Sequence, residues 1–153
     1  MQVCGSRHPG YPYLALNEQR DMPRFSVGYR FPEQTVHVSP DRVQQYLAAV
    51  GSESPLYHGD GNVAPPLAIA AWVLAGLIEA IGLPPGSVHA TQEFSFQDIA
   101  PVDSTLTATA EVVQATSRAG MDVIVVEITA FHQNRPILSG RSMLMMPGSE
   151  EAE

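Results

Sequence analysis

The sequence contains no lysine, because all eight of its basic residues are arginines. This excludes a Schiff-base or general-base lysine and the phosphate-binding lysine of a P-loop. Cys4 is the only cysteine, which excludes an internal disulfide and a zinc site built from several cysteines. Charged residues make up 16% of the chain, against about 25% in typical soluble domains. The net charge of −8 argues against nucleic-acid binding, and the low charge suggests apolar surface that a partner subunit covers.

One stretch is apolar enough to raise the question of a membrane helix, but its composition argues against one. Residues 63–83 have about the length that a span needs, yet the stretch includes Pro65, Pro66 and Glu79. It predicts a helix buried in a globular fold. The first thirty residues show no apolar leader, so we expect a cytoplasmic protein without membrane contact.

The chain has the length of one domain, with 153 residues. Residues 1–33 show little periodicity and many prolines and glycines, and we interpret them as a lead-in segment with one strand near residues 25–29. Residues 34–147 are predicted to form the domain, and residues 148–153 an acidic tail.

Two helices are predicted from the residues at their ends. Ser39, Pro40 and Asp41 are typical of a helix start, since they supply a capping oxygen, a fixed φ angle and an acid near the positive end of the helix dipole. Gly51 predicts the end of this helix. A glycine-rich loop then extends to residue 62, and a long apolar helix is predicted over residues 66–81.

From residue 88 onward the hydrophobic period changes from helical to extended. Apolar and polar residues alternate over residues 104–113, and a second apolar row in residues 121–131 ends at Asp122. Residues 34–38, 88–96 and 136–146 predict three further strands. A long apolar helix followed by antiparallel strands with one apolar face predicts an α+β fold, in which a curved sheet covers the helix nearly all round. This is the hotdog architecture.

Five segments of the chain resemble the MaoC-like hydratases and dehydratases of acyl thioesters, and among these the N-terminal dehydratase domains of the fungal-synthase type. The resemblance covers residues 36–147. The segments that carry it are SPDRVQQYLAAVG, GSESPLYHGDG, VAPPLAIAAW, VHATQEFSF and IAPVDSTLTATAEV. It implies a single hotdog domain and a (3R)-3-hydroxyacyl thioester of coenzyme A or acyl carrier protein, interconverted with its trans-2-enoyl form without a cofactor.

Active members of this family carry an aspartate and, five positions later, a histidine in the loop before the central helix. Both groups are needed, because water must lose a proton as it attacks C3 while another proton reaches C2. Backbone N–H groups at the start of the helix stabilise the developing enolate oxygen. The resemblance assigns that role here to Leu67 and Ala68, and it places His89 on the strand beside the thioester channel.

The loop of this sequence lacks the proton-transfer pair. Aligning Gly51 and Pro55 with the glycine and proline of the family's loop puts Ser52 at the aspartate and Tyr57 at the histidine. Neither hydroxyl is a base near neutral pH. The resemblance therefore implies a non-catalytic or degenerate subunit that binds the acyl thioester, as a homodimer or as a heterodimer with a separate catalytic hotdog chain.

Two alternatives remain open at this point. Glu53 and His58 have the same five-residue separation, and Asp60 is near enough in sequence to orient the imidazole, so a shifted loop would make them an active acid–base pair. Glu79 on the apolar helix suggests a hotdog acyl-CoA thioesterase, in which a buried helix carboxylate activates water. The histidines of the other strands have no carboxylate at ligand spacing, so we predict no metal site.

Overall fold

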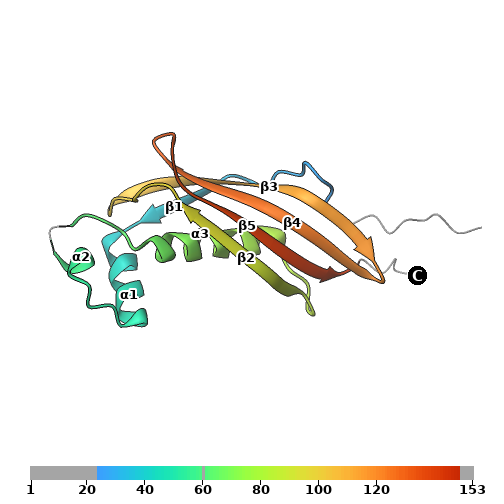
Figure 1. Ribbon diagram of the computed structural model, residues 1–153, viewed down its shortest axis with the longest axis horizontal. Helices are drawn as coiled ribbons and strands as arrows, with labels where there is room; N and C mark the ends of the chain where they lie inside the picture. The colour runs from blue at the N-terminus through green and yellow to red at the C-terminus, as the bar shows by residue number, and fades with distance from the viewer. Residues whose placement is uncertain (1–23, 60, 149–153) are drawn as a thin grey trace, which may run out of the picture.

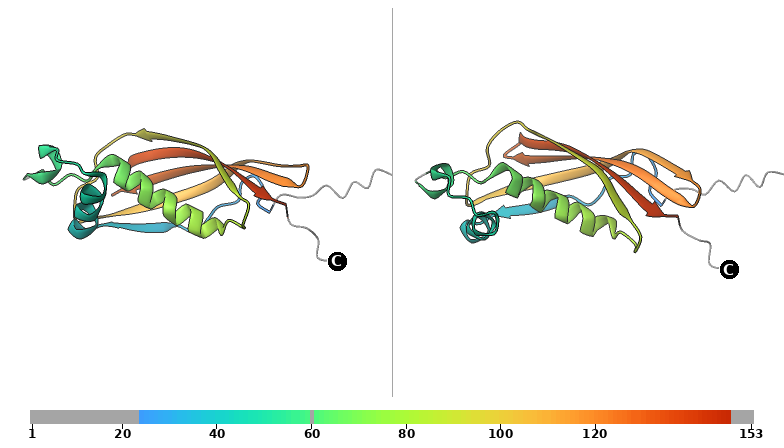
Figure 2. Two further views of the ribbon diagram at one scale, coloured as in Figure 1. Left: turned by 90° about the horizontal axis from the view of Figure 1, so that it is seen from below. Right: turned by 60° about the horizontal axis from the view of Figure 1, so that its bottom comes forward.

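The computed structural model describes residues 24–59 and 61–148. In chain order its elements are β1 (Gln34–Val38), α1 (Pro40–Val50), α2 (Pro55–His58), α3 (Pro66–Ile81), β2 (Val88–Phe96), β3 (Ser104–Arg118), β4 (Met121–His132) and β5 (Arg135–Pro147). The five strands form one antiparallel sheet in the order β1-β3-β4-β5-β2. The sheet curves around α3, which lies along its concave face (Figures 1 and 2). The predicted hotdog fold is confirmed.

Both predicted helices begin and end where their sequence signals place them. The Ser39 hydroxyl accepts a hydrogen bond from the Arg42 N–H at 3.4 Å, and α1 ends at Gly51, whose φ of 63° is left-handed. Gly82 closes α3 in the same way, with a φ of 60°. The apolar segment therefore ends after 16 helical residues. Among the described residues, no helix has the length and hydropathy needed to cross a membrane.

The alternating rows of β3 and β4 supply most of the sheet's contribution to the core. On β3 the buried row is Leu106, Ala108, Ala110 and Val112, and on β4 it is Asp122, Ile124, Val126, Ile128 and Ala130. A bulge between Val112 and Gln114 lets β3 continue to Arg118, five residues beyond the predicted end at residue 113. The two-residue period thus predicted the buried face correctly and the strand length less well.

The central helix is covered on one side, and the prediction that the sheet encloses it nearly all round is wrong for the single chain. Six residues of α3 are buried against the sheet: Ala68, Ile69, Ala70, Val73, Leu77 and Ile81. The opposite side carries the exposed residues Leu67, Ala71, Ala75 and Glu79, one per turn. Leu67 is 62% exposed. A five-stranded sheet curves far enough to bury only one face of this helix, so an apolar face stays open.

Strand β2 is an edge strand with little burial on either face. It pairs with β5 on one side and has no partner strand on the other within the described residues. Val88 is 52% exposed and Phe96 is 42% exposed. An exposed sheet edge with large apolar side chains is a site at which another chain can add a strand.

The prediction of a strand near residues 25–29 is wrong. This segment forms a turn in which the Tyr29 N–H donates to the Ser26 carbonyl at 3.1 Å, and an isolated bridge with β3 forms one residue later, at Arg30. The left-handed φ of 86° at Gly28 breaks the extended conformation. Phe25 and Phe31 are nevertheless buried, so the core includes two residues from the predicted lead-in segment. Cys4 lies outside the described residues.

Candidate functional site

The loop between α1 and α3 holds the positions at which a proton-transfer pair was sought. The sequence predicted a loop throughout, but residues 55–58 form the short helix α2, which begins at a proline. At Gly61 a side chain would lie 2.7 Å from the Leu56 carbonyl oxygen, so glycine is needed for the chain to return toward α3. The loop is therefore a folded projection at one end of the molecule (Figure 1).

Ser52 follows the end of α1 at Gly51, and Tyr57 lies in α2. Both side chains are partly buried, and Tyr57 packs against the hydrophobic core. The Ser52 N–H donates to the Leu47 carbonyl at 3.0 Å, which fixes the loop to the end of α1. The two positions expected to match the catalytic pair thus carry hydroxyl side chains that are partly buried.

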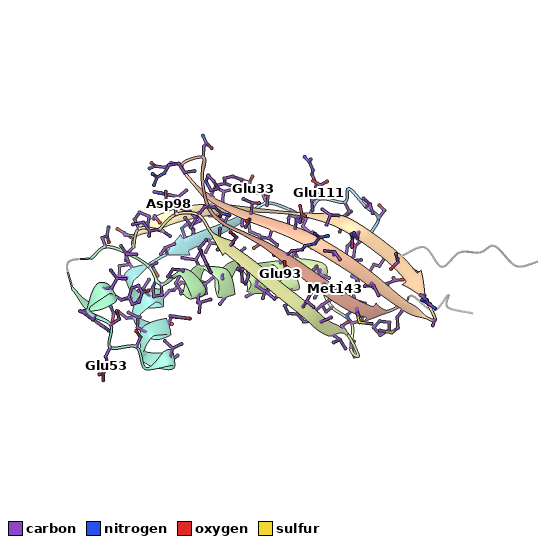
Figure 3. All side chains as sticks on the ribbon, viewed as in Figure 1. Glu33, Glu53, Glu93, Asp98, Glu111 and Met143 are labelled. Atoms are coloured by element: carbon purple, nitrogen blue, oxygen red, sulfur yellow. The ribbon has the colours of Figure 1, made fainter. Side chains whose placement is uncertain are left out.

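Glu53 and His58 line one open pocket of about 480 Å³, together with Ser52, Pro55 and Gly59. The His58 Nε2 lies 2.7 Å from the Ser52 carbonyl oxygen. A carbonyl can only accept, so this nitrogen carries a proton and is engaged with the backbone. The Glu53 side chain is exposed and extends away from the molecule (Figure 3), and no hydrogen bond joins it to His58 in the described part of the loop. Asp60 lies outside the described residues.

The start of α3 offers one free backbone donor, whereas two were predicted. The Ala68 N–H donates to the Pro65 carbonyl at 3.0 Å, so this predicted donor already has an acceptor within the helix start. Pro66 has no N–H. The Leu67 N–H has no acceptor among the described residues, and it remains the donor that an oxyanion could reach.

His89 lies at the opposite end of α3 from Leu67. Six residues connect the end of α3 to β2, so His89, near the start of β2, lies near the C-terminal end of the helix. The other end of β2 leads to the segment in which the Ala64 N–H donates to the Ala100 carbonyl at 2.8 Å, beside the start of α3. In a single chain, His89 and Leu67 therefore lie near opposite ends of α3.

A hydrogen-bonded chain of polar side chains holds His89 in place. Its Nε2 lies 3.1 Å from the Gln92 Oε1, and the Ser142 hydroxyl donates to the same oxygen. Ser142 is completely buried, although its neighbours in the same row of β5 are apolar or glycine. Gln92 and Ser142 were not among the predicted site residues. The polar Ser142 between Gly140 and Leu144 was the available signal.

Glu79 does not meet the condition that suggested a thioesterase. The side chain is exposed in the last turn of α3, at the far end from the loop. No element of the described residues buries this carboxylate. Within residues 24–59 and 61–148, no group of three metal-ligating side chains comes together either.

Comparison with known proteins identifies one matching family and several solved structures with the same fold. The family model "FAS1-like, dehydratase domain region" matches residues 26–139. No curated protein matches the chain. R-hydratase PhaJ1 from Pseudomonas aeruginosa is 19% identical, with a TM-score of 0.69 over 88% of this chain and 94% of that one.

Two other solved structures have the same fold at a similarly low sequence identity. The MaoC-like dehydratase from Rhodospirillum rubrum is 16% identical, with a TM-score of 0.70 over 83% of this chain and 96% of its own. A chain of the ChsH1-ChsH2 complex from Mycobacterium tuberculosis is 15% identical, with a TM-score of 0.66 over 79% and 98% of the two chains.

Proposed function

Because this chain belongs to the FAS1-like dehydratase family, a MaoC-like group with the hotdog fold, we propose that it is a non-catalytic subunit of an (R)-specific hydratase or dehydratase. In this proposal it binds the acyl thioester of coenzyme A or acyl carrier protein. The proton transfers take place in another hotdog chain that carries the aspartate and histidine.

The observation that supports this proposal is the pair of hydroxyls at Ser52 and Tyr57. Hydration of an enoyl thioester needs a base for water and an acid for C2 on either side of one reacting centre. Tyr57 instead packs against the core, and the nearby imidazole of His58 donates to the Ser52 carbonyl. The free Leu67 N–H, by contrast, retains a means of binding the thioester oxygen.

The open edge of β2 and the uncovered face of α3 support pairing with a second hotdog chain. The exposed side of α3 carries Leu67, Ala71 and Ala75, and β2 carries the exposed apolar residues Val88 and Phe96 among polar ones. One of the structures with the same fold is a complex of two chains, ChsH1 and ChsH2. The pairing partner is either another copy of this chain or a chain with the catalytic pair.

The test measures binding and turnover in the same purified protein. Crotonyl-CoA is titrated calorimetrically, and its hydration is followed by the loss of the enoyl-thioester absorbance. We expect binding without turnover above the uncatalysed rate. Turnover by the wild type that is abolished in His58→Ala would overturn the proposal in favour of the Glu53/His58 pair. His37→Gln, at the other edge of the sheet, is the control for handling and folding.

A further inference from the structure

The face of the sheet opposite α3 contains an open hollow near the turn between β4 and β5. Its volume is about 480 Å³, within the range of roughly 300–1,000 Å³ that small-molecule sites occupy. Six residues from β3, β4 and the segments next to β1 and β5 line it: Glu33, Thr107, Thr109, Phe131, Gln133 and Asn134. None of them belongs to the loop or the helix start that the proposed thioester site uses.

The alternation of the strands explains why these side chains share one face. The even-numbered residues of 106–112 on β3 are buried toward α3, so Thr107 and Thr109 point to the opposite side. Phe131 of β4 lies opposite Thr107, and cross-strand partners point to the same side. Glu33, one residue before β1, also lies on the side of the sheet away from α3 (Figure 3).

The hollow forms because small side chains lie between larger ones. Thr107 and Thr109 on β3 form its floor, with Glu33 beside β1 on one side and Phe131 of β4 on the other. Because β3 separates β1 from β4, these two walls are two interstrand spacings apart, about 9–10 Å. This width leaves room for a ring-shaped ligand above the two threonines.

The Glu33 carboxylate is exposed and has no ionic partner within the described residues. It differs in this from Glu111 on the same face, which accepts from the Arg30 Nε at 2.9 Å. Arg135, which follows the turn, instead pairs with Asp98 at 3.1 Å. The carboxylate of Glu33 can therefore accept hydrogen bonds from a ligand without losing a bond within the chain.

The turn residues Gln133 and Asn134 carry side chains where glycine would fit with less strain. Their φ angles are 48° and 66°, both left-handed. A two-residue hairpin turn of this kind favours Asn-Gly, and glutamine is not among the residues enriched at left-handed φ. Each side-chain amide brings two N–H donors and one carbonyl acceptor to the hollow. A side chain retained at a conformational cost points to a role for that side chain.

We propose that this hollow binds a neutral saccharide, with one sugar ring on Phe131 and its hydroxyls bonded to Glu33 and to the turn amides. The C–H groups on one side of a pyranose form an apolar face with partial positive charge, which the negative face of an aromatic ring attracts. Two adjacent hydroxyls can donate to the two oxygens of one carboxylate, and the same hydroxyls can accept from amide N–H groups.

Charged ligands fit this set of groups less well. The Glu33 carboxylate and the net charge of −8 oppose phosphates and other anions. An alkylammonium ion could contact the carboxylate and the Phe131 ring, but it has no acceptor for the N–H groups of Gln133 and Asn134. A sugar ring supplies donors and acceptors together, so it matches all the polar groups of the hollow.

Amide proton–nitrogen NMR spectra of the full chain test the proposal, with cellobiose as the probe. We expect weak binding, in the millimolar range, because the hollow is open and few contacts hold the ligand. The signals that shift should be the backbone amides of residues 107–109 and 131–134 and the side-chain amides of Gln133 and Asn134. Sorbitol, a polyol without a ring, should leave these signals unchanged at the same concentration.

Two substitutions and a matched control test the residues that make the contacts. Glu33→Gln removes the charge, and Phe131→Leu replaces the ring by an aliphatic side chain. Each should weaken cellobiose binding by about three- to tenfold. Glu93→Gln changes an exposed carboxylate on the opposite edge strand and should bind like the wild type. Because Glu33 is exposed, Glu33→Gln should keep the wild-type melting temperature even if Phe131→Leu lowers it.

The outcomes separate this inference from the proposed function. The absence of shifts with cellobiose, or unchanged affinity of Glu33→Gln, would overturn the inference. Shifts of the same signals with choline and not with cellobiose would overturn it in favour of a cation site. Thioester binding is measured separately, so a chain that binds cellobiose but not crotonyl-CoA would lose the proposed function and keep this inference.

Discussion

The substitution Gly140→Ala tests how the edge strand is held against the body of the sheet. Gly140 of β5 lies opposite Phe94 of β2. A Cβ at this position would lie 2.7 Å from the Phe94 Cδ1 and 3.0 Å from the Glu93 carbonyl oxygen. Ordinary carbon contacts are about 3.5–4.0 Å, so the ring must move by about 1 Å. Overpacking of this kind costs about 1–3 kcal/mol of the free energy of unfolding.

Urea denaturation of the wild type, the two single mutants and the double mutant tests whether the Phe94 ring causes the loss of stability in Gly140→Ala. In the Phe94→Ala background the methyl group no longer meets a ring, and Gly140→Ala should cost less by about 1–2 kcal/mol. Gly59→Ala is the glycine control, since its Cβ would make an ordinary contact at 3.4 Å with the Pro55 carbonyl oxygen. It should change stability by less than about 0.5 kcal/mol. An equal cost of Gly140→Ala in both backgrounds would refute the reasoning.

Three further predictions concern the buried carboxylate, the central helix and the loop. Asp122→Ala should cost about 1–3 kcal/mol in urea denaturation, because it leaves a backbone N–H and a hydroxyl without their acceptor, and Asp122→Asn should cost less because it keeps one oxygen. Gly76→Ala should be close to neutral in the wild type, where its Cβ would lie 2.8 Å from the Gln34 Cδ, and should stabilise by about 1 kcal/mol once Gln34→Ala removes that contact. The double substitution Ser52→Asp/Tyr57→His should give measurable crotonyl-CoA hydration where the wild type gives none, and neither single substitution should do so, because both proton transfers are needed.

Local signals in the sequence predicted those parts of the fold that depend on neighbouring residues. The bounds of α3 were correct because a proline and a glycine determine them, and the buried rows of β3 and β4 follow from a strict two-residue period. The strand predicted near residues 25–29 is wrong because a single glycine, Gly28, takes a left-handed conformation and determines a turn. Strand lengths depend on bulges, and no residue of β3 predicts the bulge between Val112 and Gln114.

The sequence suggests which residues belong to the candidate site but not how they are arranged. Ser52 and Tyr57 could be located from Gly51 and Pro55 alone, because the loop is a contiguous motif. The Ala68 N–H is hydrogen-bonded, whereas the Leu67 N–H has no acceptor among the described residues. This difference depends on the conformation of one helical turn, which sequence patterns do not specify. The link from His89 to Ser142 spans two strands that are distant in sequence, and only their register brings the side chains together.

The low charge of the chain and the open surfaces of the fold have one explanation. A single sheet buries one side of α3 and leaves its other side, with Leu67, exposed beside an unpaired β2. Charged residues at these positions would make the single chain more soluble but would oppose the approach of a second sheet. The 16% of charged residues fits the proposal that a second hotdog chain covers these surfaces.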